Sequence, residues 1–214
     1  MGNAYLKELI DTLTDKDNLK LVREEAVSFL KNHSVSECFY TAMELYQSEY
    51  FQIQNIGVFL CGYIAVERED ALSFLKDTVS VNPSWKVQEV LAMAFDAFCK
   101  ANGYKESVPI MQEWMNSDNA NTRRAVTEGL RIWTSRPYFK DYPEKAIELI
   151  ASLKDDESEY VRKSVGNSLR DISKKHPDLV KAELFNWDIS SKRRMQVYKL
   201  AAKSISASER EVSV

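Results

Sequence analysis

One residue pair recurs six times in this 214-residue chain, each time near the start of a predicted helix: a mostly apolar residue followed by Arg or Gln. The pairs are Val22-Arg23, Ile53-Gln54, Val87-Gln88, Thr122-Arg123, Val161-Arg162 and Arg193-Arg194. From position 23 to 54, 88, 123, 162 and 194 the steps are 31, 34, 35, 39 and 32 residues. A regular period of this size is typical of repeat proteins, in which one helix pair cannot bury its own apolar face and stacked pairs share a core.

The helix predicted over about residues 159–174 illustrates the sequence pattern of the second helix in each repeat. Acidic and small polar residues precede it, as at a helix N-cap, and four apolar residues then follow at three- and four-residue steps. They are Val161, Val165, Leu169 and Ile172. With only six Gly and five Pro in the chain, the sequence predicts an all-α solenoid of about six HEAT-like helix pairs, curved with a concave face.

The same reading places helices along the whole chain. They are expected at about residues 4–13, 19–32, 35–46, 50–66, 70–79, 84–100, 108–115, 122–133, 144–153, 159–174, 177–185 and 192–204. A longer connection is expected over 135–143. We predict one HEAT-like repeat domain over residues 1–205 and a flexible tail over 206–214.

Composition narrows the function classes. No apolar run approaches the roughly 18–20 residues that a membrane helix needs, and the N-terminus does not resemble a signal peptide. Cys38, Cys61 and Cys99 are isolated and are expected to be buried, and His33 and His176 complete no zinc pattern. We therefore expect no metal, no cofactor and no membrane partner, and a cytoplasmic monomer.

Charge is unevenly distributed along the chain. Residues 1–118 hold 10 basic and 18 acidic residues, a net charge of −8, whereas residues 119–203 hold 18 basic and 12 acidic residues, a net charge of +6. A basic half on an acidic chain can supply a phosphate-binding surface. Solvated helix faces would give the same count, so from charge alone both interpretations stay open.

Several stretches resemble the DNA alkylation repair family of HEAT-like glycosylases, the AlkD and AlkC proteins. The clearest begins at Ser158 with Ser-Glu-Tyr-Val-Arg-Lys-Ser-Val-Gly-Asn-Ser-Leu-Arg and continues through His176-Pro-Asp-Leu-Val180. Shorter matches are Ser191-Lys-Arg193, Asn121-Thr-Arg-Arg-Ala125 and Trp85-Lys-Val-Gln-Glu89. The resemblance covers roughly residues 80–205 and implies excision of cationic N3- or N7-alkylated purines from double-stranded DNA, largely without drawing the base into a deep pocket.

The resemblance also implies catalytic residues. The family's catalytic carboxylate lies four residues after a Trp on one helix, a spacing that Trp85 and Glu89 reproduce and that places both on one helix face. A carboxylate there would stabilise the oxocarbenium-like sugar in the transition state and orient the attacking water. The AlkD branch has Asp where this chain has Glu89, and Ser84 or Lys86 replaces a further aromatic.

Basic residues on the second helices are the predicted phosphate contacts, because a guanidinium offers paired donors to phosphate. The predicted DNA-binding residues are Arg123, Arg124, Arg162, Asn167, Arg170, Lys192, Arg193 and Arg194. Asn167 stands where the AlkD branch has a second Trp. Three alternatives stay open: the repeated Arg and Gln residues bond the neighbouring repeat; Arg162–Glu159 and Arg170–Asp171 are local ion pairs; and the chain is a catalytically weak or inactive DNA- or protein-binding module.

Overall fold

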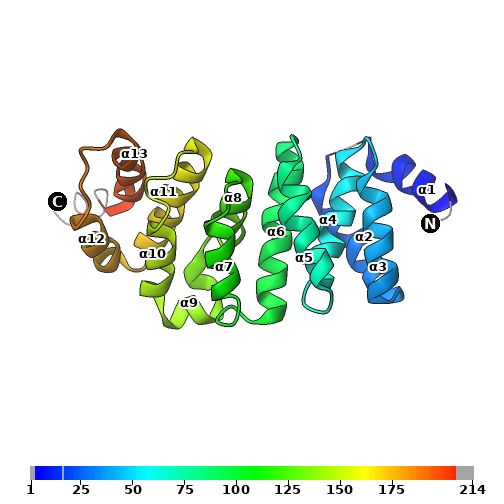
Figure 1. Cartoon of the computed structure of the whole chain (residues 1–214), viewed down its shortest axis with the longest axis horizontal. Coiled ribbons are helices and arrows are strands. Elements are labelled where there is room, and N and C mark those ends of the chain that lie inside the picture. The colour runs from blue at the N-terminus through cyan, green and yellow to red at the C-terminus, as the bar shows by residue number, and fades with distance from the viewer. Residues whose placement is uncertain (1–2, 16, 206–214) are drawn as a thin grey trace, which may run out of the picture. The chain divides into compact units, whose positions relative to one another are not determined.

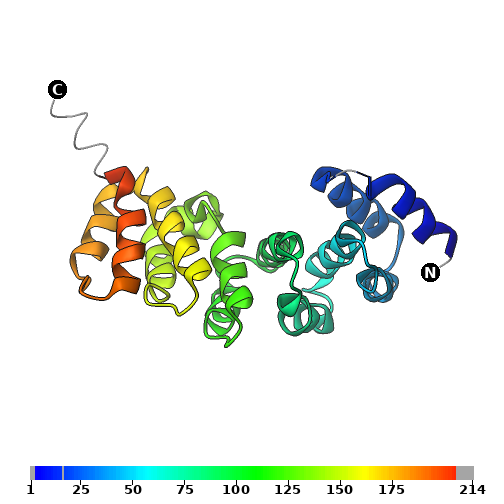
Figure 2. The same cartoon turned by 90° about the horizontal axis from the view of Figure 1, so that it is seen from above.

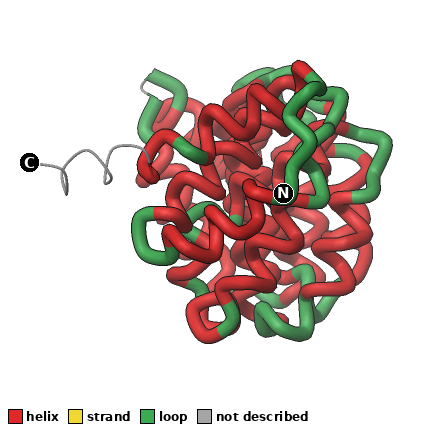
Figure 3. Tube along the Cα trace, turned by 90° about the vertical axis from the view of Figure 1, so that its left-hand side faces the viewer, coloured by secondary structure: helices red, strands yellow, loops and turns green. Residues whose placement is uncertain are grey.

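The computed structural model describes residues 3–15 and 17–205, and within them the chain is helices and loops without a strand (Figure 3). The α-helices are α1 (Asn3–Leu13), α2 (Leu19–Asn32), α3 (Val35–Tyr46), α4 (Phe51–Ile64), α5 (Glu69–Asp77), α6 (Trp85–Asn102), α7 (Val108–Met115), α8 (Ala120–Gly129), α9 (Pro137–Asp141), α10 (Pro143–Ala151), α11 (Glu159–Ser173), α12 (Pro177–Phe185) and α13 (Lys192–Ala201). Two 3₁₀ turns, η1 (Val79–Val81) and η2 (Trp133–Ser135), complete this part of the chain. None of the described helices combines the length and apolarity that a membrane crossing requires.

The chain divides into two compact units, residues 1–103 and 104–214, and each is described by itself. In both units, antiparallel helices lie side by side as stacked pairs (Figures 1 and 2). The predicted all-α solenoid of helix pairs is confirmed. A single domain over residues 1–205 and a concave curvature stay predictions, and the predicted tail over 206–214 lies outside the described residues.

Helix α4 is the centre of the first unit. It packs against α1, α2, α3, α5 and α6, and eleven of its 14 residues are buried. Gly62 permits the approach of α6, because a Cβ at this position would lie 2.6 Å from the Ala94 Cα. This close packing explains why α4 is apolar on nearly every face rather than along one stripe.

Helix α11 is the centre of the second unit, where it packs against α8, α10, α12 and α13. The predicted apolar stripe is confirmed, since Val161, Val165, Leu169 and Ile172 are all fully buried. Gly166 lies against α13, where any larger residue would bring its Cβ to 2.6 Å from the Leu200 Cβ.

The segment 129–143 differs from the sequence prediction. Helix α8 ends at Gly129 rather than near Trp133, and Ile132 adopts a left-handed φ of 56°. This turn brings Trp133 into the core, where its ring meets that of Phe139 with centroids 4.9 Å apart. Because Phe139 is carried by α9, the predicted loop contains a short helix.

Candidate functional site

The repeated Arg and Gln residues, hereafter the ladder residues, share one contact. Except for Arg23, each donates a side-chain hydrogen bond to the backbone carbonyl six residues earlier. The bonds are Gln54 Nε2 to Ser48 O (2.8 Å), Gln88 Nε2 to Asn82 O (2.8 Å), Arg123 Nη1 to Ser117 O (2.8 Å), Arg162 Nη1 to Asp156 O (2.7 Å) and Arg194 Nη1 to Asp188 O (2.9 Å). Each ladder residue therefore fixes the loop that precedes its own helix. Arg23 instead donates from Nε to the Tyr63 hydroxyl at 3.3 Å.

The residue six positions before each of the five other ladder residues forms the same kind of turn in every case. Its side-chain oxygen accepts the backbone N–H two residues further on, which is the geometry of an Asx or Ser/Thr turn. The acceptors are Ser48, Asn82, Ser117, Asp156 and Asp188, over 2.8–3.2 Å. The turn presents its carbonyl to the ladder residue, so loop and ladder residue form one structural unit in every repeat.

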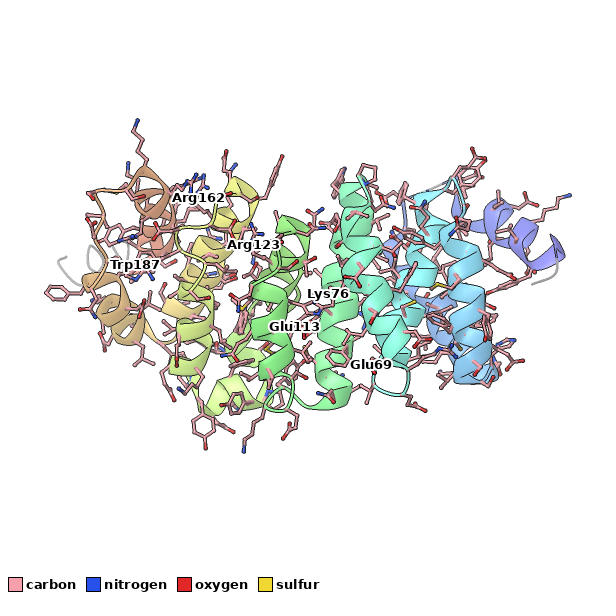
Figure 4. All side chains as sticks on the ribbon, viewed as in Figure 1. Glu69, Lys76, Glu113, Arg123, Arg162 and Trp187 are labelled. Atoms are coloured by element: carbon pink, nitrogen blue, oxygen red, sulfur yellow. The ribbon has the colours of Figure 1, made fainter. Side chains whose placement is uncertain are left out.

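Arg123 also ties its repeat to the next one. Its Nε and Nη2 donate to the two carboxylate oxygens of Asp156 at 2.6 and 2.8 Å (Figure 4 labels Arg123 on α8). The Asp156 side chain is only 4% exposed and that of Arg123 13%. The hydrogen bond to Asp156 is the main cause that raises the pKa of the Arg123 guanidinium above its ordinary value.

Two further predicted DNA-binding arginines make similar contacts. Arg162 donates from Nε to Gln196 Oε1 on α13 at 2.8 Å, and Arg194 donates from Nε to Asp155 at 2.8 Å and pairs with it through Nη2 at 2.6 Å. Loop 155–157 thus accepts hydrogen bonds from Arg123, Arg162 and Arg194. These guanidinium groups hold repeats in register, and phosphate contact by them stays a prediction.

The two local ion pairs considered from the sequence are replaced by others. Asp171 pairs with Arg131 at 3.2 Å and with Lys174 at 2.8 Å, rather than with Arg170. Glu159 pairs with Lys163 at 2.7 Å on the exposed side of α11, while Arg162 turns toward α13. Adjacent residues do not face one another on a helix, which accounts for the missing Arg170–Asp171 pair, and Arg162 is engaged by Gln196 and by the carbonyls of loop 156–157.

Four other predicted DNA-binding residues have side chains that are not engaged within the described part of the protein, and they are called uncommitted below. Among described residues, the side chains of Arg124, Asn167, Arg170 and Lys192 make no hydrogen bond or ion pair. Arg193 is half exposed and lies 3.9 Å from the exposed Glu157, a contact worth little. These five lie on α8, α11 and α13, which pack successively in the second unit. Of the predicted DNA-binding residues, these five are the ones whose side chains are not engaged in close contacts between repeats, and DNA contact by them stays a prediction.

The predicted catalytic pair lies at the start of α6. Trp85 is 62% exposed, and Glu89 is exposed one turn later. Lys86 lies between the two residues in the sequence and contacts the indole. Its Nζ lies 4.5 Å from the Trp85 ring centroid and forms an ion pair with Asp17. The indole and the carboxylate therefore border one charged, partly aromatic region.

A shallow pocket of about 180 Å³ opens beside Glu89. Its lining comes from the loop before α2 and from helices α2, α4 and α6: Asp17, Leu19, Phe51, Asn55, Lys86 and Glu89. Trp85 does not line the pocket, but its ring is contacted by the lining residue Lys86. Sequence reasoning missed Phe51 and Asn55, although a signal was present: they hold the same positions relative to Gln54 as Trp85 and Glu89 hold relative to Gln88.

The two units differ in charge. Residues 1–103 carry nine basic and 15 acidic residues, a net charge of −6, and residues 104–214 carry 20 basic and 17 acidic residues, a net charge of +3. The described residues contain no group of three or more His, Cys, Asp or Glu side chains suited to a metal ion. The three cysteines are buried, as expected, and burial raises the pKa of the Cys61 thiol to about 12.

Comparison with known proteins identifies relatives along most of the chain. Residues 18–198 match the family model described as DNA alkylation repair enzyme. The crystal structure of AlkD2 from Streptococcus mutans is 51% identical, with a TM-score of 0.91 over 94% of this chain and 97% of that one. The structure of smu.31 from S. mutans UA159 is 52% identical, with a TM-score of 0.87 over 92% and 98%.

Two more distant relatives carry less information. The alkylpurine DNA glycosylase AlkC of Pseudomonas fluorescens, solved with DNA containing an abasic site analog, is 22% identical with a TM-score of 0.57, over 86% of this chain and 56% of that one; it shares the fold. The uncharacterized protein YhaZ of Bacillus subtilis is 41% identical over 78 residues, 35% of this chain. The match spans only 22%, about a fifth, of YhaZ.

Proposed function

The chain belongs to the DNA alkylation repair enzyme family, and from this premise we propose that it is a DNA glycosylase that excises cationic N3- or N7-alkylated purines from double-stranded DNA. Glu89 is the proposed catalytic carboxylate, and Trp85 is its aromatic neighbour. The proposed location is the bacterial cytoplasm, and the proposed form is a monomer.

One observation carries the proposal: Glu89 is an exposed carboxylate on the rim of a pocket, one helical turn from the exposed ring of Trp85. The described residues give Glu89 no side-chain partner, whereas the nearby Asp17 is held by Lys86. Glu89 is therefore the carboxylate of this region that is available to a substrate.

The chemistry needs only one such group. An alkylated purine already carries a positive charge, so it leaves without protonation by a general acid. The sugar that remains develops positive charge in the transition state, which a fixed carboxylate stabilises, and the same carboxylate can orient the attacking water. An exposed indole adds an aromatic face that attracts cationic groups.

Phosphate contact is assigned to the second unit. Arg124, Arg170, Lys192 and Arg193 supply the proposed DNA-binding cations, with Asn167 beside them. Lys192 and Arg193 open α13, where the N-cap Ser191 makes no side-chain cap hydrogen bond. A phosphate at this helix start would satisfy free backbone N–H groups and relieve the repulsion between the cations and the helix dipole.

The test is base release from double-stranded DNA that contains N3-methyladenine or N7-methylguanine. Wild-type protein should release the base, and Glu89→Gln should slow release by about 10²–10³-fold, the usual loss when one transition-state electrostatic contact is removed. Glu67→Gln is the matched control, since Glu67 is an exposed acid at the opposite end of α4 from the pocket. Equal release by Glu89→Gln would remove Glu89 from catalysis.

A second candidate is a catalytically weak or inactive DNA- or protein-binding module. The observation that favours it is the engagement of Arg123, Arg162 and Arg194 in contacts between repeats, together with the net charge of −6 on the unit that holds Glu89. Binding that weakens with salt, without base release by the wild type, would establish this alternative.

A further inference from the structure

The ammonium group of Lys86 lies close to two aromatic rings and a carboxylate. Its Nζ is 4.5 Å from the ring centroid of Trp85 on α6 and 5.5 Å from that of Phe51 on α4. Both distances are within the roughly 6 Å over which an aromatic ring attracts a cation. The same Nζ pairs with Asp17, in the loop before α2. Three segments of the first unit therefore form a site for a cation, and the chain's own lysine fills it.

The surroundings of Lys86 carry more negative charge than its ammonium neutralises. Glu89 lines the same pocket as Lys86 and Asp17, and no residue that the structure describes pairs with its carboxylate. The charged lining residues are thus two carboxylates and one ammonium, a net charge of −1. A surface of this sign attracts a further cation and repels an anion such as phosphate.

The contacts that hold Lys86 in this position are individually weak. The side chain of Asp17 is 50% exposed, and an ion pair with so much access to water contributes little. Lys86 is the second residue of α6, where the positive end of the helix dipole disfavours a cation. The ammonium is strongly hydrated and sits on a flexible four-carbon stem. It can therefore leave the rings and return to water when another cation arrives.

We propose that Lys86 is an internal competitor, whose ammonium occupies the indole face of Trp85 until a cationic group of the substrate displaces it. A flat organic cation suits this face better than an ammonium does, because it stacks on the ring and gives up less hydration. A neutral group lacks the attraction to Asp17 and Glu89 that offsets the lost contacts of Lys86. Lys86 thus determines selectivity: it admits cationic groups to Trp85 and excludes neutral ones.

This inference rests on the proposed function only for the origin of the cation, which is the alkylated base. Displacement takes place on the exposed face of Trp85, so it agrees with a base that stays outside a deep pocket. The expected effect of a substitution also has an unusual sign. Loss of the Lys86 charge should strengthen the binding of cations, whereas loss of an ordinary binding residue weakens binding.

Trp85 itself supplies the signal for the experiment. It is 62% exposed, whereas Trp114, Trp133 and Trp187, the other three tryptophans, are at most 7% exposed, so a quencher in solution acts mainly on Trp85. The full-length protein is titrated with N-methylpyridinium, a flat organic cation that quenches indole fluorescence, and with the neutral quencher acrylamide. Lys86→Met keeps the length of the side chain without its charge and should bind N-methylpyridinium about 5- to 10-fold more tightly than the wild type. Acrylamide should quench both proteins equally.

Three further variants keep the outcome clear. Lys86→Arg retains a cation at the rings and should bind N-methylpyridinium no more tightly than the wild type. Lys31→Met makes the same change of charge at an exposed lysine of α2 and should bind like the wild type. If Lys86→Met does not fold, the equally uncharged Lys86→Gln decides. Equal binding of N-methylpyridinium by the wild type and the uncharged variant would overturn the proposal. So would an equal rise in quenching by acrylamide, which would mean that the lysine only shields the indole.

Base release from double-stranded DNA with alkylated purines, measured in parallel, separates this inference from the proposed function. Tighter binding of N-methylpyridinium by Lys86→Met, without base release by the wild type, supports the internal competitor and contradicts the glycosylase proposal. Base release by the wild type, together with unchanged binding of N-methylpyridinium by Lys86→Met, contradicts the internal competitor alone.

Discussion

The two units hold their repeats together with the same geometry but with different chemistry. In the first unit the Asn82 Nδ2 donates to Gln54 Oε1 at 3.3 Å, a bond between two neutral amides of consecutive repeats. In the second unit the equivalent positions are Arg123 and Asp156, which form a bidentate ion pair. Asn82 and Asp156 each lie six residues before the ladder residue of their own repeat.

Arginine and glutamine do different work at the ladder positions of the two units. Glutamine suffices to hold the preceding loop, because Gln88 reaches the carbonyls of both Val79 and Asn82. Arg123 holds the loop and also neutralises the buried carboxylate of Asp156 in the next repeat. The surplus of basic residues in the second unit is therefore partly structural, and the remaining cations are those proposed to contact DNA.

The largest effect on stability is expected at Asp156, where the second unit has a buried ion pair and the first unit has only a bond between neutral amides. Asp156→Asn leaves the guanidinium of Arg123, whose side chain is only 13% exposed, beside a neutral amide, so the free energy of unfolding should fall by about 3–5 kcal/mol. Chemical denaturation of the full chain measures this loss. Asp141→Asn, at an exposed acid of the same unit, should change stability by no more than about 0.5 kcal/mol. A loss below about 1 kcal/mol at Asp156 would show that the pair is dispensable.

The neutral counterpart should be weaker. Asn82→Ala removes hydrogen bonds to the Tyr46 hydroxyl and to Gln54, and the acceptor for the Ser84 N–H. Because net hydrogen bonds between neutral groups contribute little each, the expected loss is about 1–3 kcal/mol. The same denaturation experiment compares it with Asp156→Ala. A larger loss at Asn82 than at Asp156 would reverse the proposed order of the two units.

The ion pairs of the second unit should also make its stability depend on pH. Burial opposes ionisation of Asp171, but hydrogen bonds and charge from Lys174 and Arg131 outweigh it and hold the pKa of its carboxyl below the ordinary value of 3.8. A depressed folded-state pKa stabilises the fold above pH 3.8, and this contribution disappears as the pH falls through the folded-state value.

Thermal melting of wild type and Asp171→Asn across pH 2–7 tests this expectation. The wild type should melt higher at neutral pH, and the gap should close as the pH falls below about 3.8. A gap that stayed constant over the whole range would mean that Asp171 acts by packing rather than by charge.

The smallest effect on stability, and the clearest on binding, is expected at the uncommitted cations. Arg124→Ala and Arg170→Ala should each leave the free energy of unfolding within about 0.5 kcal/mol of the wild type. Each should also reduce the slope of log affinity for double-stranded DNA against log salt by about 0.9. Fluorescence anisotropy over a salt series measures the slope. Lys31→Ala, at an exposed lysine of α2, is the control and should leave it unchanged.

Much of the fold could be predicted from the sequence, because each repeat is specified by residues close together in the chain. The helical pairs and the apolar stripe of α11 follow from short-range preferences, and the structure confirms them. The resemblance to the DNA alkylation repair family is also confirmed, by the family model and by the S. mutans structures.

What the sequence did not reveal depends on contacts between distant residues. The left-handed Ile132 is required by the burial of Trp133, which no local rule announces. The partner of Arg123 lies 33 residues away, so periodicity located the arginine without identifying its carboxylate. The pocket required α2, α4 and α6 to meet, although the repeated spacing of Phe51–Asn55 and Trp85–Glu89 was visible in the chain.

The central claim is a division of labour, with chemistry at Glu89 and phosphate binding at the uncommitted cations. The most direct measurement is single-turnover base release from N3-methyladenine DNA at saturating protein, with Glu89→Gln compared with the double variant Arg124→Ala/Arg170→Ala. Glu89→Gln should lower the release rate by about 10²–10³-fold, whereas the double variant should keep the wild-type rate once saturated. Absence of release by the wild type, or the same rate for Glu89→Gln as for the wild type, would contradict the claim.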